Sequence, residues 1–226
     1  MTHSRILSTM VHTVPALRRI NGFSLMELLI AVGMVALLTS ICVPVIASVR
    51  GAARRTQCAS NLRQIGQAMS LYASDHNDLY PLAADAAIRL SGCNHFCHDD
   101  LTKVAFSIPM LPMAISRYVK AQEIWRCPSD RGEVVITRPH VSYPSLYDKS
   151  GVSYYYNVFF ALRRVQAGRI DVDFPLLWDA GWHWHGHWGP GGRGNVLFED
   201  GHVKGHTLTQ FGFLFSPGTP PKGTTP

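Results

Sequence analysis

The pattern of apolar and polar positions divides the chain into an apolar N-terminal run and a mixed remainder. Residues 23–49 are almost entirely apolar, and Glu27 is the single charged residue among them. A helix of 22 uncharged residues, from 28 to 49, is about 33 Å long at roughly 1.5 Å per residue. That length crosses a hydrocarbon core of about 30 Å. The pattern therefore predicts a membrane-spanning helix over residues 23–49.

Three other interpretations of the apolar run stay open on the residues alone. A buried core helix is one, although an uncharged run of this length is unusual for it. A cleavable secretory signal is another, because Val45-Ile46-Ala47 offers a cleavage site ending in a small residue. A lipoprotein anchor at Cys42 is the third, but bulky Ile41 stands where a small residue is wanted.

A helical pattern continues beyond the apolar run. Apolar residues recur there at spacings of three and four, which places them on one helix face. These residues are Cys58, Leu62, Ile65, Met69 and Tyr72. Polar residues 75–78 and then Pro81 end the pattern. We expect the helix to continue over residues 50–80 and to pack this face on the globular part of the chain.

The remainder is irregular and rich in Pro, Gly and aromatic residues. It predicts a globular domain over residues 81–215, a short helix near 112–120 and a disordered tail over 216–226. Asp200-Gly201 predicts the turn of a hairpin. The expected fold is α+β, with a long N-terminal transmembrane helix packed on a small antiparallel sheet. Its predicted strands are residues 134–137, 153–160, 176–178, 195–198 and 202–204.

Charge adds little to this picture. The chain carries a formal net charge of +6, but residues 1–22 hold three arginines and no acid. The remainder has 18 basic and 15 acidic residues, so a nucleic-acid partner is not expected. Arginines also follow the apolar run at Arg50, Arg54 and Arg55. Because positive charge flanks both ends, the charge pattern does not fix the orientation in the membrane.

Glu27 needs a compensating partner. A carboxylate near the start of a membrane helix is unfavourable unless it is paired. If the chain were cut between Gly22 and Phe23, the new α-amino group of a neighbouring subunit would supply a positive partner. The helix N-terminus also favours negative charge. The residues therefore suggest that subunits pack through this pair.

These residues resemble a type IV prepilin signal. The resemblance is carried by Arg18-Arg19-Ile20-Asn21-Gly22 followed by Phe23-Ser24-Leu25-Met26-Glu27-Leu28-Leu29-Ile30. It implies that residues 1–22 are a leader, and that a prepilin peptidase cuts after Gly22 and N-methylates Phe23. It also implies that Glu27 and Pro44 act in assembly, and that the leader is cytoplasmic.

Four later segments resemble bacterial pilin-like proteins that are described as similar to type II secretion pseudopilins. They are Asn61-Leu62-Arg63-Gln64-Ile65-Gly66, Tyr72-Ala73, Trp125-Arg126-Cys127-Pro128-Ser129-Asp130 and Asp200-Gly201-His202. The implied function is a structural subunit of a type II secretion pseudopilus or a type IV pilus-like filament. The implied partners are copies of itself or related pilins, the prepilin peptidase, the inner membrane and the assembly machinery. The implied location is a single-pass inner-membrane protein with its globular part in the periplasm or in an extracytoplasmic filament.

The cysteines suggest either a disulfide or a metal site. Residues 93–100 hold two cysteines, two histidines and two aspartates, a set that could bind zinc. An exported protein favours disulfides instead, and we expect Cys93 or Cys97 to pair with Cys127. Cys58, on the predicted helix face, is interpreted as a buried core residue.

A second candidate metal site lies in the segment that alternates Trp and His from residue 182 to 188. If this segment is a strand, His183, His185 and His187 share one side and could bind a transition metal. Alternatively, the tryptophans pack on the sheet and the histidines face solvent. Since some secretion pseudopilins bind calcium in C-terminal loops, Asp179 and Asp200 are candidate calcium ligands.

Catalysis has no support in the sequence. It contains no nucleophile elbow, no phosphate-binding loop and no helical His-Glu pair at metalloprotease spacing. We therefore expect a protein that is not an enzyme and has no catalytic residue. The alternative function is a membrane-tethered metal- or ligand-binding protein that uses a pilin-like anchor.

Overall fold

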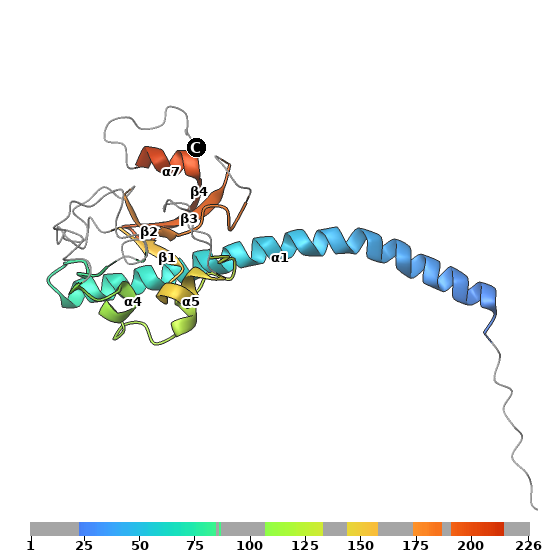
Figure 1. Cartoon of the computed structure of the whole chain (residues 1–226), viewed down its shortest axis with the longest axis horizontal. Coiled ribbons are helices and arrows are strands. Elements are labelled where there is room, and N and C mark those ends of the chain that lie inside the picture. The colour runs from blue at the N-terminus through green and yellow to red at the C-terminus, as the bar shows by residue number, and fades with distance from the viewer. Residues whose placement is uncertain are drawn as a thin grey trace, which may run out of the picture. The chain divides into compact units, whose positions relative to one another are not determined.

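The computed structural model describes residues 23–84, 86, 107–132, 144–157, 174–186 and 191–214. A long helix and a four-stranded antiparallel sheet give an α+β fold, which confirms the predicted class (Figure 1). The chain forms two units, Met1–Ile46 and Ala47–Pro226, and the boundary falls inside the long helix. Several predicted features lie outside the described residues: the leader with Gly22, Cys93, Cys97, the strand at 134–137, His187 and the tail.

The sheet has the strand order β1-β2-β3-β4, and all its pairs are antiparallel. The strands are β1 (Tyr154–Tyr156), β2 (Pro175–Asp179), β3 (Arg193–Phe198) and β4 (Val203–Thr207). The predicted hairpin is confirmed, since β3 pairs with β4 and Gly201 takes a positive φ of 86° in the turn between them. Of the predicted strand at 153–160, strand β1 covers Tyr154–Tyr156, and residues 158–160 lie outside the described residues.

Helix α1 (Leu25–Asp75) supplies one side of the core. Its predicted apolar face is confirmed, because Cys58, Leu62, Ile65 and Met69 are almost completely buried. They pack with β1, Leu177 of β2 and Leu197 of β3 in a single cluster. At Gly66 a Cβ atom would lie only 3.0 Å from the Leu197 side chain, so the missing side chain lets the helix approach the sheet.

Strand β3 alternates its side chains between the two faces of the sheet, as the strand geometry requires. Leu197 belongs to the α1 cluster, whereas Val196 and Phe198 form a second cluster with Trp182. Phe211 of α7 (Leu208–Leu214) packs against this second cluster. The sheet therefore lies between α1 on one face and α7 on the other (Figure 1).

Helix α1 ends where the sequence predicted an end. Asn77 and Asp78 take positive φ values of 56° and 59°, and the Asp78 N–H donates to the Ala73 carbonyl at 2.8 Å. Such a left-handed ending satisfies carbonyls that the helix leaves open.

The predicted helix near 112–120 is wrong in extent, because α4 (Leu111–Ala114) ends at Ala114. The backbone then turns, with the Tyr118 and Val119 N–H groups both donating to the Ile115 carbonyl. Two further short helices, η1 (Gln122–Trp125) and α5 (Leu146–Ser150), complete the described elements.

Candidate functional site

The first half of α1 has an apolar surface on every side. Each Leu, Ile, Val, Met and Phe in residues 23–49 is exposed, by 49 to 80%. The hydroxyl groups of Thr39 and Ser40 donate to backbone carbonyls of the preceding turn, so they need no water. By length and composition this stretch is able to cross a membrane. A helix that is apolar all round is suited to lipid or to a bundle of similar helices.

The residues singled out for processing and assembly lie along this surface. Phe23 precedes the helix and is 72% exposed. Glu27 lies in the first turn of α1, where the helix dipole favours a negative charge. Pro44 lies within the helix.

A disulfide joins the second half of α1 to the loop after η1. It links Cys58 to Cys127, whose positions are 69 residues apart in the sequence. The predicted role of Cys127 in a disulfide is confirmed, but the predicted partner is wrong: Cys58, not Cys93 or Cys97, is bonded to it. The prediction failed because it treated Cys58 as a core residue alone, whereas the Cys127 loop packs directly on its helix face.

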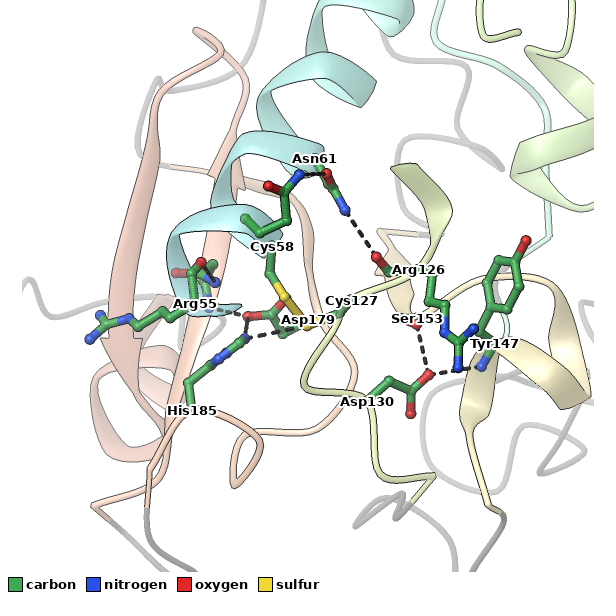
Figure 2. The surroundings of a disulfide bond; sticks show 12 residues. Arg55, Cys58, Asn61, Arg126, Cys127, Asp130, Tyr147, Ser153, Asp179 and His185 are labelled. Atoms are coloured by element: carbon green, nitrogen blue, oxygen red, sulfur yellow. Dashed lines mark hydrogen bonds and ion pairs between the residues drawn. A yellow bond between two sulfur atoms is a disulfide. The ribbon is translucent and has the colours of Figure 1, made fainter. Parts of the chain in front are cut away.

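Hydrogen bonds hold the loop against the helix beside the disulfide. One turn after Cys58, the Asn61 Nδ2 group donates to the Arg126 carbonyl at 2.9 Å. Gln57 Nε2 donates to the other end of the Asn61 side chain at 3.0 Å. Asn61 is buried and matches both its donor and its acceptor, so it fixes the register between α1 and the loop (Figure 2).

A carboxylate and an imidazole point at the disulfide (Figure 2). His185 Nε2 lies 3.0 Å from Asp179 Oδ2 and 3.5 Å from Cys127 Sγ. The Asn195 N–H donates to the same carboxylate oxygen at 2.6 Å. The side chains of Asp179 and His185 are both fully buried. Burial, together with the nearby Asp179 carboxylate, raises the pKa of Tyr154 well above its ordinary value.

The loop continues from Cys127 to Asp130, whose carboxylate organises the next segment. It accepts backbone N–H groups of Gly132, Leu146 and Tyr147 at 2.8 to 2.9 Å. It also accepts the hydroxyl groups of Ser153, at 2.7 Å, and Ser145, at 3.3 Å. Two of the N–H donors open helix α5, so Asp130 joins the disulfide loop to α5 and to the start of β1.

The predicted histidine metal site is not formed as expected. Residues 181–186 make turns and not a strand, with the Trp184 N–H donating to the Gly181 carbonyl and the Gly186 N–H to the His183 carbonyl. Alternation between two faces requires a strand, so the arrangement predicted for His183 and His185 does not apply here. Instead, His185 joins Cys58, Cys127 and Asp179, which are the candidate metal ligands among the described residues.

The two candidate calcium ligands lie in different places and have other partners. Asp179 lies at the end of β2 beside the disulfide, whereas Asp200 lies in the β3–β4 turn and accepts the backbone N–H and the ring nitrogen of His202. These hydrogen bonds lower the pKa of Asp200.

Sequence reasoning missed the Cys58 pairing, the Asn61 contact and the position of Asp179 beside the sulfurs. The sequence offered one indication of these contacts: Cys58 lies on the predicted buried helix face, and Asn61 lies beside it.

The comparisons with known proteins support only a coarse relationship. A family model described as a protein of unknown function (DUF1559) matches residues 47–87, which is less than a fifth of the chain. This family is associated with pilin-like proteins and pseudopilins. No curated protein and no solved structure matches the chain. The matched segment holds Cys58, Asn61 and the rest of the helix face that packs on the sheet.

Proposed function

We propose that the chain is a structural subunit of a type II secretion pseudopilus or a type IV pilus-like filament. The observation that carries this proposal is the contrast between the two halves of α1. The first half exposes apolar side chains on all sides, and the second half buries one face against the sheet. A soluble domain gains nothing from some 27 residues of exposed apolar helix, whereas a membrane-inserted subunit that later joins a helical bundle needs them.

In this proposal, a prepilin peptidase removes residues 1–22 and leaves Phe23 as a methylated N-terminus. The ammonium group of one subunit then pairs with Glu27 of its neighbour, and the apolar helices bundle in the filament core. Glu27 in the first turn of α1 supports this role, because its carboxylate is then available at the end of the helix where the neighbouring N-terminus would lie.

The disulfide has a mechanical role in the same proposal. A subunit drawn from the membrane is pulled through α1, and the pull must reach the globular part. The Cys58–Cys127 bond connects α1 covalently to the loop that also carries Asp130 and its contacts to α5 and β1. The load is therefore shared by a covalent bond as well as by packing.

The N-terminus of the protein extracted from membranes tests the proposal. Mass spectrometry should find a chain that begins at N-methylated Phe23. A Gly22→Val variant should keep residues 1–22, while the neighbouring Asn21→Ala variant should still be cut. A chain that begins after Ala47, or one that retains Met1, would contradict the proposal.

Filament incorporation separates this function from a tethered metal- or ligand-binding protein with a pilin-like anchor. Glu27→Gln removes the charge at nearly constant size, so it should reduce incorporation into filaments strongly, whereas Glu27→Asp should retain part of it. The matched control is Gln67→Glu, which places a charge on an exposed part of α1 outside the apolar half. Equal membrane levels and equal filament content for all three chains would favour the tethered binding protein.

A further inference from the structure

Four side chains with metal-ligating atoms meet around the disulfide. One ligand atom each of Cys58, Cys127, Asp179 and His185 lies within 4.8 Å of all the others. They come from four separate segments: α1, the loop after η1, the end of β2 and the turn after it. Their side chains are buried, with exposed fractions of 0 or 1%. Such convergence of two sulfurs, one imidazole and one carboxylate is the composition of a zinc site.

Two polar atoms in this cluster lack the hydrogen bonds that burial normally demands. Within the part of the chain that the structure describes, Asp179 Oδ1 and His185 Nδ1 are buried and have no hydrogen-bond partner. The disulfide offers them little, because a bonded sulfur is a poor acceptor and not a donor. A buried carboxylate with one unsatisfied oxygen is unfavourable unless it is compensated. The Asp179 carboxylate therefore has an oxygen that, among the described residues, the oxidised state leaves without a partner.

We propose that reduction of the Cys58–Cys127 bond converts this cluster into a binding site for one Zn²⁺ ion. The two thiolates, the imidazole of His185 and the carboxylate of Asp179 would be its four ligands. With Zn–S distances of about 2.3 Å and Zn–N or Zn–O distances of about 2.0 to 2.2 Å, tetrahedral ligands lie roughly 3.3 to 3.8 Å apart.

The existing separations are close to this requirement. His185 Nε2 lies 3.0 Å from the Asp179 oxygen and 3.5 Å from the Cys127 sulfur. Once their bond is broken, the two sulfurs must move apart, and the remaining separations, all within 4.8 Å, must settle near the same values.

The chemical step balances with a dithiol as the reductant, for example the reduced form of a thiol–disulfide oxidoreductase. Two electrons and two protons pass from the dithiol to the Cys58 and Cys127 sulfurs, and the dithiol becomes a disulfide. Zinc then displaces both thiol protons, and His185 binds as a neutral imidazole through Nε2 with its proton on Nδ1. The ion carries two positive charges, and its three anionic ligands leave the buried site with a single negative charge.

The disulfide and the zinc ion would then be alternative links at one place. Each joins α1 to the loop after η1, so the reduced chain keeps this junction closed before oxidation occurs. Metal binding contributes to folding when the site does not exist in the unfolded chain. This inference does not depend on the filament proposal, because it concerns the junction and not the apolar helix.

Cobalt titration of the full chain in detergent tests the inference. The variant C42S/C93S/C97S keeps Cys58 and Cys127 as its two cysteines, so any thiolate–cobalt absorption band must come from them. After reduction with a metal-free phosphine and removal of the reagent, we expect one equivalent of Co²⁺ with thiolate charge-transfer absorption. Zinc should displace it. The same chain left oxidised should give no such band.

Further variants check the other two ligands. Asp179→Asn and His185→Ala should each weaken cobalt binding tenfold or more, while His202→Ala, in the exposed β3–β4 turn, should leave it unchanged. If the reduced three-serine variant binds no cobalt, or binds it equally when oxidised, the inference is wrong. Because that comparison leaves all four ligands intact, it stays decisive even if a ligand variant fails to fold.

Discussion

Asp130 is the residue whose replacement should reveal how the disulfide loop stabilises the globular part. It accepts three backbone N–H groups and two hydroxyl groups, and its side chain is partly exposed. Asp130→Ala removes all five acceptor contacts at once. It leaves the N–H groups of Leu146 and Tyr147 without the carboxylate that opens helix α5.

The size of the effect follows from these contacts. A hydrogen bond to a charged group contributes about 1.5 to 3 kcal/mol, and contributions that share one carboxylate are not additive. Water can replace part of the loss, because the carboxylate is not fully buried. We therefore expect Asp130→Ala to lower the free energy of unfolding by about 3 to 5 kcal/mol. Asp130→Asn keeps the size of the side chain, but its NH2 group would face N–H donors that need an acceptor. The free energy of unfolding should therefore fall by about 1.5 to 3 kcal/mol.

Urea unfolding followed by tryptophan fluorescence measures this loss. All five tryptophans lie between residues 125 and 188, so the signal of the full chain in detergent reports on the globular part and not on the apolar helix. With a slope of about 2 kcal/mol per molar urea, the midpoint for Asp130→Ala should fall by roughly 1.5 to 2.5 M.

Asp148→Ala is the matched control, because Asp148 is an exposed carboxylate in helix α5, whose first N–H groups donate to Asp130. Its midpoint should change by less than about 0.5 M. If Asp130→Ala lies within that range, the Asp130 contacts do not stabilise the fold as argued.

Two further predictions concern packing and pH. Gly66→Leu should destabilise the globular part by about 1 to 3 kcal/mol, because the new side chain would meet Leu197. Gly51→Leu is the control, because position 51 faces open space and the substitution should have no such effect. The midpoints of urea unfolding compare the two variants, and equal midpoints would refute the close helix–sheet contact. Burial raises the pKa of Tyr154 and Tyr156 well above 10, so both phenols stay protonated in the folded state. Their stabilising contribution is complete below pH 10 and is lost as the pH rises above it. The urea midpoint should therefore decrease when the pH is raised from 9 to 11.5, and an unchanged midpoint would contradict this assignment.

The elements that the sequence predicted well are those in which local periodicity and burial coincide. The helix face that begins at Cys58 repeats at three and four residues, and the structure buries it. The turn at Asp200-Gly201 needs one residue with positive φ, and glycine supplies it. In both cases neighbours in the sequence decide the outcome.

The features that could not be predicted depend on contacts between distant segments. The Cys58–Cys127 pair needs the loop after η1 to lie on α1, and the Asn61 contact that sets this register spans 65 positions in the sequence. The histidine interpretation failed for a related reason: period-two alternation has meaning only in a strand, and residues 181–186 turn instead. His185 reaches Asp179 through that turn, which no spacing rule indicates.

The position of the disulfide along α1 has a physical logic of its own. Cys58 is the first buried residue of the helix, so the covalent bond lies where α1 enters the core of the globular part. Packing contacts such as those of Leu62 and Ile65 lie farther along the helix. A force applied through the exposed half of α1 would reach the first buried turn before the others, and separation of α1 from the sheet would begin there. A bond at Cys58 resists that first step, whereas a bond near Met69 would leave the entry turn to packing alone.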